Sequence, residues 1–287
     1  MLVLTREAYP GILRFTMRAN LDGKVAIVTG AGRYRGIGRH VALTLARHGA
    51  DVVITGSGRS PDKFPDEEKE MGWRDIESVA DEIRALGRRA LPVVASSADA
   101  NDCQMLVEAT KRELGRIDIL VNNAAAGRGN DRVPFVQLEE SEWRRVLETN
   151  LTGTFLVTKA AGKVMIDQGE GGAIINISSI LGRQGVAMQG AYSVSKAGMI
   201  LFTQVLAMEM APHKIRVNCV CPGLVDTDRM KDVTRPGPIH DAVMGTIPLR
   251  RPGDPEEIGE LVAFLAGPDA SYIHGQTINI DGGRVMS

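Results

Sequence analysis

Short apolar runs alternate along this chain with longer segments in which apolar residues recur every three or four positions. The runs predict strands at 25–29, 51–55, 90–95, 117–124, 173–178, 215–220 and 277–280. The longer segments predict helices at 37–48, 73–87, 101–114, 141–167, 190–211 and 256–266. Apolar strands that are joined by helices form parallel sheets covered on both faces. The pattern therefore predicts an α/β fold with one doubly wound, seven-stranded parallel sheet and helices on both faces.

Two polar stretches interrupt this alternation. Residues 56–72 are rich in Gly, Pro and charge, and they predict a surface insertion; residues 228–253 contain several prolines and predict a mobile loop. No repeat or linker divides the rest, so residues 21–287 are expected to form a single domain behind an N-terminal arm of residues 1–20. The natural opening of the first strand after Met17 raises the hypothesis that residues 1–16 precede the native start.

Composition narrows the class of protein. With 34 basic and 35 acidic residues and a net charge of −1, the chain has no basic tract that predicts nucleic-acid binding. No apolar run approaches the roughly 18 residues of a membrane span, so no membrane partner is expected. The three cysteines, Cys103, Cys219 and Cys221, have neither disulfide density nor metal-ligand spacing. Reduced thiols, a cytoplasmic location and no bound metal are expected.

A glycine-rich turn, TGAGRYRGIG at 29–38, connects the first strand to the first helix. Glycine lets a phosphate approach the backbone, and the free N–H groups at the start of a helix then bind the anion. A glycine turn that only joins a strand to a helix is the competing interpretation, so this signal alone is weak.

A second group of residues supports a ligand-binding role for this turn. Tyr192 and Lys196 are four residues apart on one face of a predicted helix, and Ser179 closes the preceding strand. The carboxyl ends of parallel strands are where ligands bind in an open sheet. The glycine turn also follows a strand, so both groups are expected at the same edge.

With these motifs the chain resembles the short-chain dehydrogenase/reductase family, of the non-extended type, over about residues 20–284. The resemblance rests on TGAGRYRGIG, NNAA at 122–125, Asn150 in ETNLTGTF, Ser179 in NISS, AYSVSK at 191–196, PGLVDT at 222–227 and INIDGG at 278–283. It implies a Rossmann-type fold and an oxidoreductase that interconverts a ketone or aldehyde and an alcohol by hydride transfer. It also implies that about residues 228–253 form the mobile substrate lid.

The resemblance also implies roles for individual residues. Tyr192 would be the general acid/base, with a pKa lowered from its usual ~10 by the cation of Lys196. Lys196 would also bind the cofactor ribose, Ser179 would hold the substrate oxygen, and Asn150 would hold a proton-relay water. The predicted cofactor-binding residues are Gly30, Gly32, Arg33, Arg35, Gly36, Ile37, Gly38, Ser57, Arg59, Ser96, Asn123, Ala124, Tyr192, Lys196, Pro222, Gly223, Val225 and Thr227.

Some positions depart from the family pattern. Ala125 replaces the more usual Gly, and Ser96 stands where an adenine-binding Asp is often found, with Asp99 close by. The long spacing of the glycine turn is similar to that of the bacterial enoyl reductases. That branch separates its Tyr and Lys by seven positions, and residue 189 here is Gln. Carbonyl chemistry is therefore preferred over enoyl reduction.

The residues after the second strand bear on the choice of cofactor. Gly56 occupies the position at which an acidic residue would accept both ribose hydroxyls of NAD(H). Ser57 and Arg59 follow, and Arg33 and Arg35 in the glycine turn are expected over the adenosine end, where guanidinium groups suit a 2′-phosphate. NADP(H) is therefore favoured, and NAD(H) is the alternative.

The helix that begins near Tyr192 is apolar nearly all round, which favours a homo-oligomer, a tetramer or a dimer, over a monomer. The substrate is expected to be a small carbonyl compound or alcohol. A 3-oxoacyl-thioester reductase of the same family is one alternative. A non-catalytic nucleotide-binding regulator is another, and the retention of Asn150, Ser179, Tyr192 and Lys196 argues against it.

Overall fold

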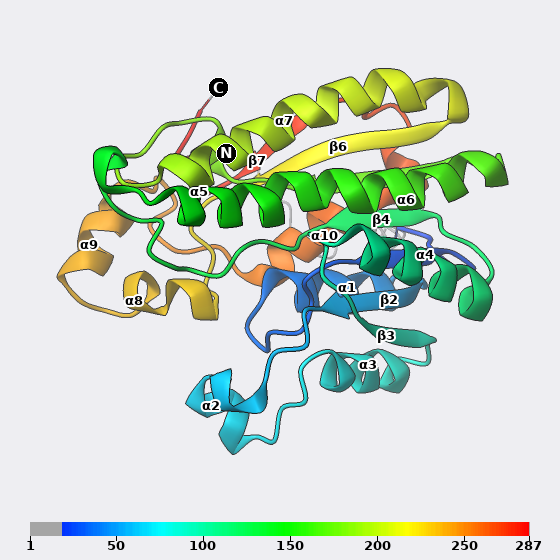
Figure 1. Ribbon diagram of the computed structural model, residues 1–287, viewed down its shortest axis with the longest axis horizontal. Helices are drawn as coiled ribbons and strands as arrows, with labels where there is room; N and C mark the ends of the chain where they lie inside the picture. The colour runs from blue at the N-terminus through cyan, green and yellow to red at the C-terminus, as the bar shows by residue number, and fades with distance from the viewer. Residues whose placement is uncertain (1–18, 287) are drawn as a thin grey trace, which may run out of the picture.

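A computed structural model describes residues 19–286 of the chain. Seven parallel strands form one sheet in the order β3-β2-β1-β4-β5-β6-β7, as the apolar runs predict (Figure 1). The strands are β1 (Val25–Val28), β2 (Asp51–Gly56), β3 (Ala90–Val94), β4 (Ile119–Asn122), β5 (Gly172–Ile177), β6 (Ile215–Pro222) and β7 (Thr277–Ile280). Of the expected N-terminal arm, residues 1–18 lie outside the described residues.

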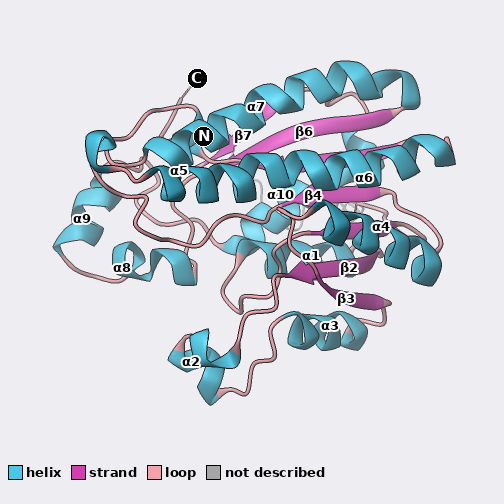
Figure 2. Cartoon of the chain, viewed as in Figure 1, coloured by secondary structure: helices cyan, strands magenta, loops and turns pink. Residues whose placement is uncertain are grey.

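The helices that cover the sheet are α1 (Ile37–Arg47), α3 (Ile76–Ala85), α4 (Ala100–Leu114), α6 (Gly153–Gln168), α7 (Gly190–Met210) and α10 (Pro255–Ala266). Ala26 and Val28 of β1 pack in a core with α1, α3 and α10. Val25 and Ile27 pack on the opposite face with α4, α6 and α7. Alternate side chains of one strand thus enter two cores, which makes the three layers of a doubly wound fold (Figure 2).

Three stretches have more structure than the sequence predicted. The insertion contains a short helix α2 (Asp66–Glu70), and the mobile loop contains α8 (Lys231–Thr234) and α9 (Pro238–Gly245). The helix expected at 141–167 is α5 (Glu140–Leu147), a π-helical turn (Glu148–Thr152) and α6. All of α2, α8 and α9 lie toward the left of the view in Figure 1, beyond the body of the sheet.

The three cysteines are free and buried, as expected. The expectation that no apolar stretch reaches membrane-spanning length was wrong for α7. By length and composition alone, the segment Gly190–His213 is long and apolar enough to cross a membrane. In this fold, 33% of its 18-residue apolar window is buried. In this fold α7 packs its buried face on the sheet beside α6, so that packing accounts for part of its apolar surface.

Candidate active site

The site lies where the strand order reverses, between the carboxyl ends of β1 and β4. The Thr29 hydroxyl accepts hydrogen bonds from the backbone N–H groups of Asn123 and Ala124, each at 3.0 Å. In return, the side-chain amide of Asn123 donates to the carbonyl oxygens of Thr29 (2.9 Å) and Gly30 (3.0 Å). These bonds draw residues 123 and 124 out of the predicted strand and fix the two loops that border the site.

The glycine turn packs too tightly for side chains at two positions. Gly30 has φ +68°, and a Cβ there would lie 2.7 Å from the Cα of Ala124. A Cβ on Gly38 would lie 2.6 Å from the carbonyl oxygen of Gly30. Helix α1 then begins after Gly36 with no side-chain cap. Its first N–H groups and its positive end thus face the groove, a donor set that fits the pyrophosphate of a dinucleotide.

Tyr192, Lys196 and Ser179 line one groove with the glycine turn, as predicted. The buried ammonium of Lys196 donates to the carbonyl oxygen of Ile177 at 2.7 Å and lies 5.8 Å from the centre of the Tyr192 ring. Burial raises the pKa of Tyr192, but the cations of Lys196, Arg229 and Arg132 and a hydrogen bond with Ser179 together outweigh burial, so its pKa falls below the usual value. Burial and the positive charge of Arg229 lower the pKa of Lys196 as well.

Asn150 lies behind this group and does not line the groove. Its side-chain oxygen accepts from the N–H of Ala126 at 2.8 Å, and its side-chain amide donates to the Ser195 hydroxyl at 2.9 Å. Its carbonyl oxygen accepts from Thr154 at 2.8 Å, inside the π-helical turn. Each polar atom of the Asn150 side chain thus has one partner within the protein, and these bonds fix the side chain behind Tyr192. The hydroxyl of Thr154 helps to hold the turn.

The predicted site residues fall into two groups with respect to this groove. The predicted residues that line it are Gly30, Gly36, Ile37, Asn123, Ser179, Tyr192, Lys196, Pro222, Gly223, Val225 and Thr227. Those that do not are Gly32, Arg33, Arg35, Gly38, Ser57, Arg59, Ser96, Ala124 and Asn150. Gly38 and Ala124 are the packing partners described above, and most of the others belong to the adenosine end.

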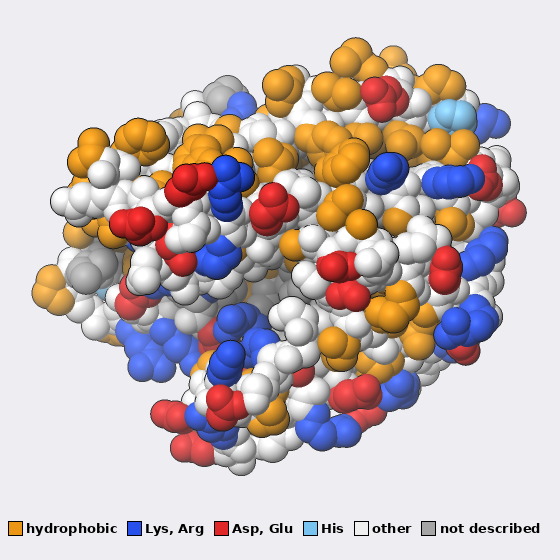
Figure 3. All heavy atoms as spheres, viewed as in Figure 1, with side chains coloured by type: hydrophobic (Ala, Val, Ile, Leu, Met, Phe, Trp, Pro, Cys, Tyr) orange, Lys and Arg blue, Asp and Glu red, His pale blue; other side chains and the backbone are white. Residues whose placement is uncertain are grey.

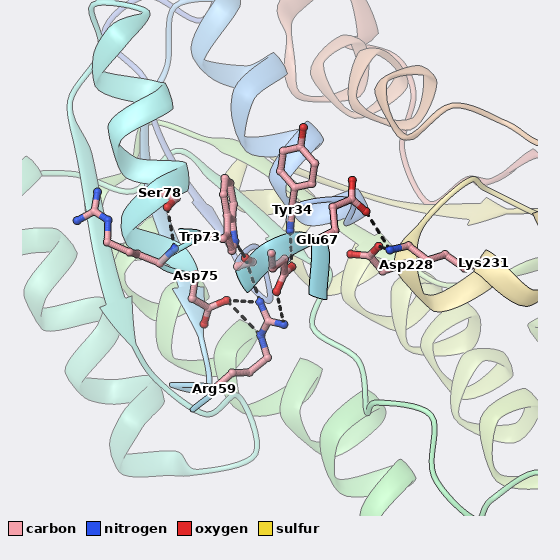
Figure 4. Close-up of polar contacts among 11 residues, drawn as sticks. Tyr34, Arg59, Glu67, Trp73, Asp75, Ser78, Asp228 and Lys231 are labelled. Atoms are coloured by element: carbon pink, nitrogen blue, oxygen red, sulfur yellow. Dashed lines mark hydrogen bonds and ion pairs between the residues drawn. The ribbon is translucent and has the colours of Figure 1, made fainter. Parts of the chain in front are cut away.

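The adenosine end is covered by the segment between β2 and α3, residues 57–75, which we call the clasp (Figure 4). The guanidinium of Arg59 pairs with Asp75 at 2.7 Å and with Glu68 at 3.0 Å, and Glu68 is 1% exposed. The indole N–H of Trp73 donates to the carbonyl oxygen of Gly32 at 2.7 Å. A Cβ on Gly32 would overlap the Asp75 carboxylate, so glycine is required where the turn meets the clasp.

The clasp also reaches the mobile loop 228–253. The ammonium of Lys231 lies 3.0 Å from the Glu67 carboxylate and 2.7 Å from that of Asp228 (Figure 4). Lys231 of α8 thus connects the clasp, at one end of the groove, to the loop 228–253, at the other end. Sequence reasoning missed this contact because 164 positions separate its two partners.

The position predicted for Arg35 was wrong. Its guanidinium pairs with Asp226 at 2.9 Å, in a separate pocket on the other side of the turn. Arg33 is exposed and faces the charges of Arg59 and Glu68, so it does lie toward the adenosine end. Ser57 is also exposed there.

Ser96 and Asp99, the two candidates for contact with adenine, form hydrogen bonds within the protein. The N–H of Ser96 donates to Asp102 at 2.8 Å. The carboxylate of Asp99 caps α4 by accepting from the N–H groups of Asn101 and Asp102. Asp99 is therefore a helix cap and not a free ligand.

Several groove residues were not predicted. They are Arg132, Leu181, Gln189, Leu224, Met230 and Arg284. Arg229 of the loop 228–253 also lines the groove, with its guanidinium 5.1 Å from the centre of the Tyr192 ring. No motif marks these positions, because they converge only through the folding of four separate loops.

Comparison with known proteins identifies the family of this chain. A family model described as "Enoyl-(Acyl carrier protein) reductase" matches residues 30–284. Among curated relatives, the 3-oxoacyl-(acyl-carrier-protein) reductase of Synechocystis sp. is 39% identical over 93% of this chain and 98% of its own length. The corresponding enzyme of Escherichia coli is 35% identical over 93% of this chain and 99% of its own.

Solved structures agree as well. A short-chain type dehydrogenase/reductase from Mycobacterium marinum has a TM-score of 0.80 and 34% identity, covering 94% of this chain and 98% of that one. A 7α-hydroxysteroid dehydrogenase, solved with NADH and 7-oxo glycochenodeoxycholic acid, has a TM-score of 0.81 and 31% identity, covering 94% and 97%. The chain belongs to the short-chain dehydrogenase/reductase family and is an oxidoreductase that uses NADP(H) or NAD(H) to interconvert a carbonyl compound and an alcohol.

Proposed function

We propose that Tyr192 is the general acid/base of this oxidoreductase and that Lys196, Ser179 and Asn150 support it. The observation that carries the proposal is the convergence of Tyr192, Lys196 and Ser179 on the groove that the glycine turn borders. The lowered pKa of Tyr192 fits a group that must exchange a proton near neutral pH.

Gly30, Gly36, Ile37 and Lys196 would hold a nicotinamide cofactor in the groove, and the cofactor would supply the hydride for reduction of the carbonyl carbon. Tyr192 donates its phenolic proton to the carbonyl oxygen, so the product is an alcohol and the phenolate remains. Lys196 stabilises that phenolate, and Ser179 orients the reacting oxygen by a hydrogen bond. The oxidation of an alcohol follows the same steps in reverse, with the phenolate as the base.

We favour NADP(H) over NAD(H) as the cofactor. Of the three arginines that were expected to favour a 2′-phosphate, two are held in ion pairs within the protein. Arg59 is held by Asp75 and Glu68, and Arg35 by Asp226. Arg33 is exposed and forms no ion pair within residues 19–286, so it is the candidate ligand of a 2′-phosphate.

A 3-oxoacyl-thioester reductase is the second candidate function. The curated relatives named above favour it, since they carry that name and match almost the whole chain. A non-catalytic regulator is disfavoured, because Tyr192 and Lys196 retain the environment that lowers the pKa of a catalytic tyrosine. We further propose a homo-oligomer, a tetramer or a dimer, and a cytoplasmic location.

Substitution of Tyr192 by Phe tests the proposal. Tyr192→Phe removes the proton donor and keeps the ring, so turnover of a ketone with NADPH should fall by about 10²- to 10⁴-fold, the usual contribution of general acid catalysis. The Kd for NADPH, from fluorescence titration, should stay within about twofold, since the phenol hydroxyl is one hydrogen bond among many. A Tyr192→Phe variant with near-normal turnover would refute the assigned role.

A further inference from the structure

The substrate end of the groove carries only positive charge. Arg132, Arg229 and Arg284 line it together with Lys196, and no Asp or Glu contributes to the lining. Lys196 already belongs to the catalytic group, so three guanidinium groups remain that no acid in the lining offsets. Such a set predicts an anionic ligand.

Acidic residues nearby do not neutralise these arginines. They are bonded to other groups: Asp131 to Arg145, Asp228 to Lys231, Asp232 to Arg128, and Asp281 to the N–H groups of Gly283 and Val285. Within residues 19–286, neither Arg132, Arg229 nor Arg284 forms an ion pair. The three guanidinium groups therefore have no ion-pair partner in the groove, although the carboxylate of Asp131 acts on Arg132 from nearby.

Arg132 shows the cost of this arrangement most clearly. Its Nε is a hydrogen-bond donor that is buried without a partner. Burial lowers the pKa of Arg132, and the like charges of Arg128 and Arg229 lower it further. A buried unpaired donor costs free energy, and a bound anion would recover that cost.

Arg229 fixes how far the anion lies from the reacting atoms. Its Nη1 donates to the carbonyl oxygen of Ala126 at 2.8 Å, and this bond holds the guanidinium beside the Tyr192 ring. A carbonyl oxygen that accepts the phenolic proton lies at the edge of the same ring. The anionic group and the reacting carbonyl of one ligand are therefore separated by only a few bonds.

We propose that the substrate is a small oxo acid or the corresponding hydroxy acid, whose carboxylate is bound by Arg132 and Arg229 next to the carbon that gains or loses hydride. Guanidinium groups suit a carboxylate because their planar forks donate two parallel hydrogen bonds. Reduction gives the hydroxy acid, with the hydride on the former carbonyl carbon and the Tyr192 proton on its oxygen, while the carboxylate stays ionised. A 3-oxoacyl thioester has no charge at this distance from its ketone. The inference rests on the proposed carbonyl chemistry and narrows its substrate.

Matched pairs of substrates test the inference. The kcat/KM with NADPH and with NADH is measured for acetoacetate and methyl acetoacetate, for 2-oxobutanoate and its methyl ester, and for an acetoacetyl thioester. We expect at least one free acid to exceed its ester by about 10- to 100-fold, the usual gain from hydrogen bonds to a charged group.

Variants then assign the preference to the groove. R132Q and R229Q should each lower the acid-to-ester ratio by about tenfold, mainly through KM for the acid. R144Q is the matched control, because Arg144 pairs with Glu140 on the exposed face of α5, does not line the groove and should leave the ratio unchanged.

Each outcome decides a separate point. Esters or the thioester reduced as well as the acids would overturn this inference and leave the proposed carbonyl chemistry standing. A preference for acids that survives both R132Q and R229Q would overturn the assignment of the anion site. No turnover of any carbonyl compound would overturn both the inference and the proposed function.

Discussion

At the scale of single residues, the charges around Tyr192 explain how a phenol can work as a base. Burial alone would hold its proton, but Lys196, Arg229, the hydrogen bond with Ser179 and Arg132 together favour the phenolate more strongly. Arg229 therefore acts on both sides of the site, because its positive charge favours the phenolate and also faces the substrate. The two effects can be separated with a neutral alcohol as substrate.

The kcat for oxidation of a neutral alcohol should rise with pH as Tyr192 loses its proton, with a midpoint below ~10, the usual tyrosine pKa. Reduction needs the protonated phenol, so its rate should fall over the same range. Arg229→Gln removes one stabilising cation and should move both midpoints to higher pH. Stopped-flow rates measured from about pH 6 to about pH 11 would check this, since that range extends to both sides of the expected midpoints. Midpoints unmoved by Arg229→Gln would contradict the role of that charge.

Arg33 and Arg35 give a matched pair for the choice of cofactor. Arg33→Ala should lower kcat/KM for NADPH by about 10- to 100-fold, through the loss of hydrogen bonds to a charged phosphate, and should change the value for NADH little. Arg35→Ala is the control, because Arg35 pairs with Asp226 away from the groove. Steady-state kinetics with both cofactors would measure the ratio. A wild-type preference for NADH that is lost in Asp75→Asn would instead make Asp75 the ribose ligand.

At the scale of elements, the clasp depends on one buried acid. Glu68 accepts from the backbone N–H of Tyr34 at 2.9 Å and pairs with Arg59, so it joins the clasp to the glycine turn. Around this pair, the Tyr34 and Trp73 rings pack edge to face with their centres 5.2 Å apart. The glycine turn is thus held in shape by residues that lie outside it in the sequence.

Glu68→Gln should loosen the clasp, because it removes one of the two ion pairs of Arg59 in a partly buried site and leaves only the pair with Asp75. Breaking a buried ion pair costs about 3 kcal/mol or more, which corresponds to a fall of roughly 5–10 °C in the apparent melting temperature. Limited proteolysis should also cut faster within residues 57–75. Glu70→Gln is the control, since Glu70 is exposed and forms no ion pair within residues 19–286. Equal melting temperatures for the two variants would contradict the role of Glu68.

The strands and the clasp also show which parts of the structure can be predicted from the sequence. Strands such as β2 and β5 could be predicted because both their faces are apolar, and Tyr192 with Lys196 because one helical turn brings them together. The clasp could not be predicted in the same way, since its contacts join residues such as Tyr34 and Glu68 that no local period connects. The error over Arg35 has the same cause: spacing placed it on the turn, and only folding turned it toward Asp226.

At the scale of the whole molecule, α7 has more apolar surface than one chain covers. Its exposed residues include Val194, Leu201, Val205 and Met208, and Phe155 of α6 lies in a neighbouring groove. Figure 3 shows hydrophobic side chains gathered along the edge that α6 and α7 form. Contiguous apolar surface of this kind marks an interface, and a second copy of the chain could cover it with its own α7.

Leu201→Glu tests that interface, because Leu201 is 63% exposed in the single chain. If the face is covered by another copy, a charge there must be desolvated, and that penalty should shift the protein to a smaller oligomer. Size-exclusion chromatography with light scattering at several concentrations would measure the change. Leu86→Glu is the control, since Leu86 is 44% exposed at the end of α3, on the opposite face of the sheet. A wild-type protein that is monomeric, or an oligomer that Leu201→Glu leaves intact, would show that this face is not the interface.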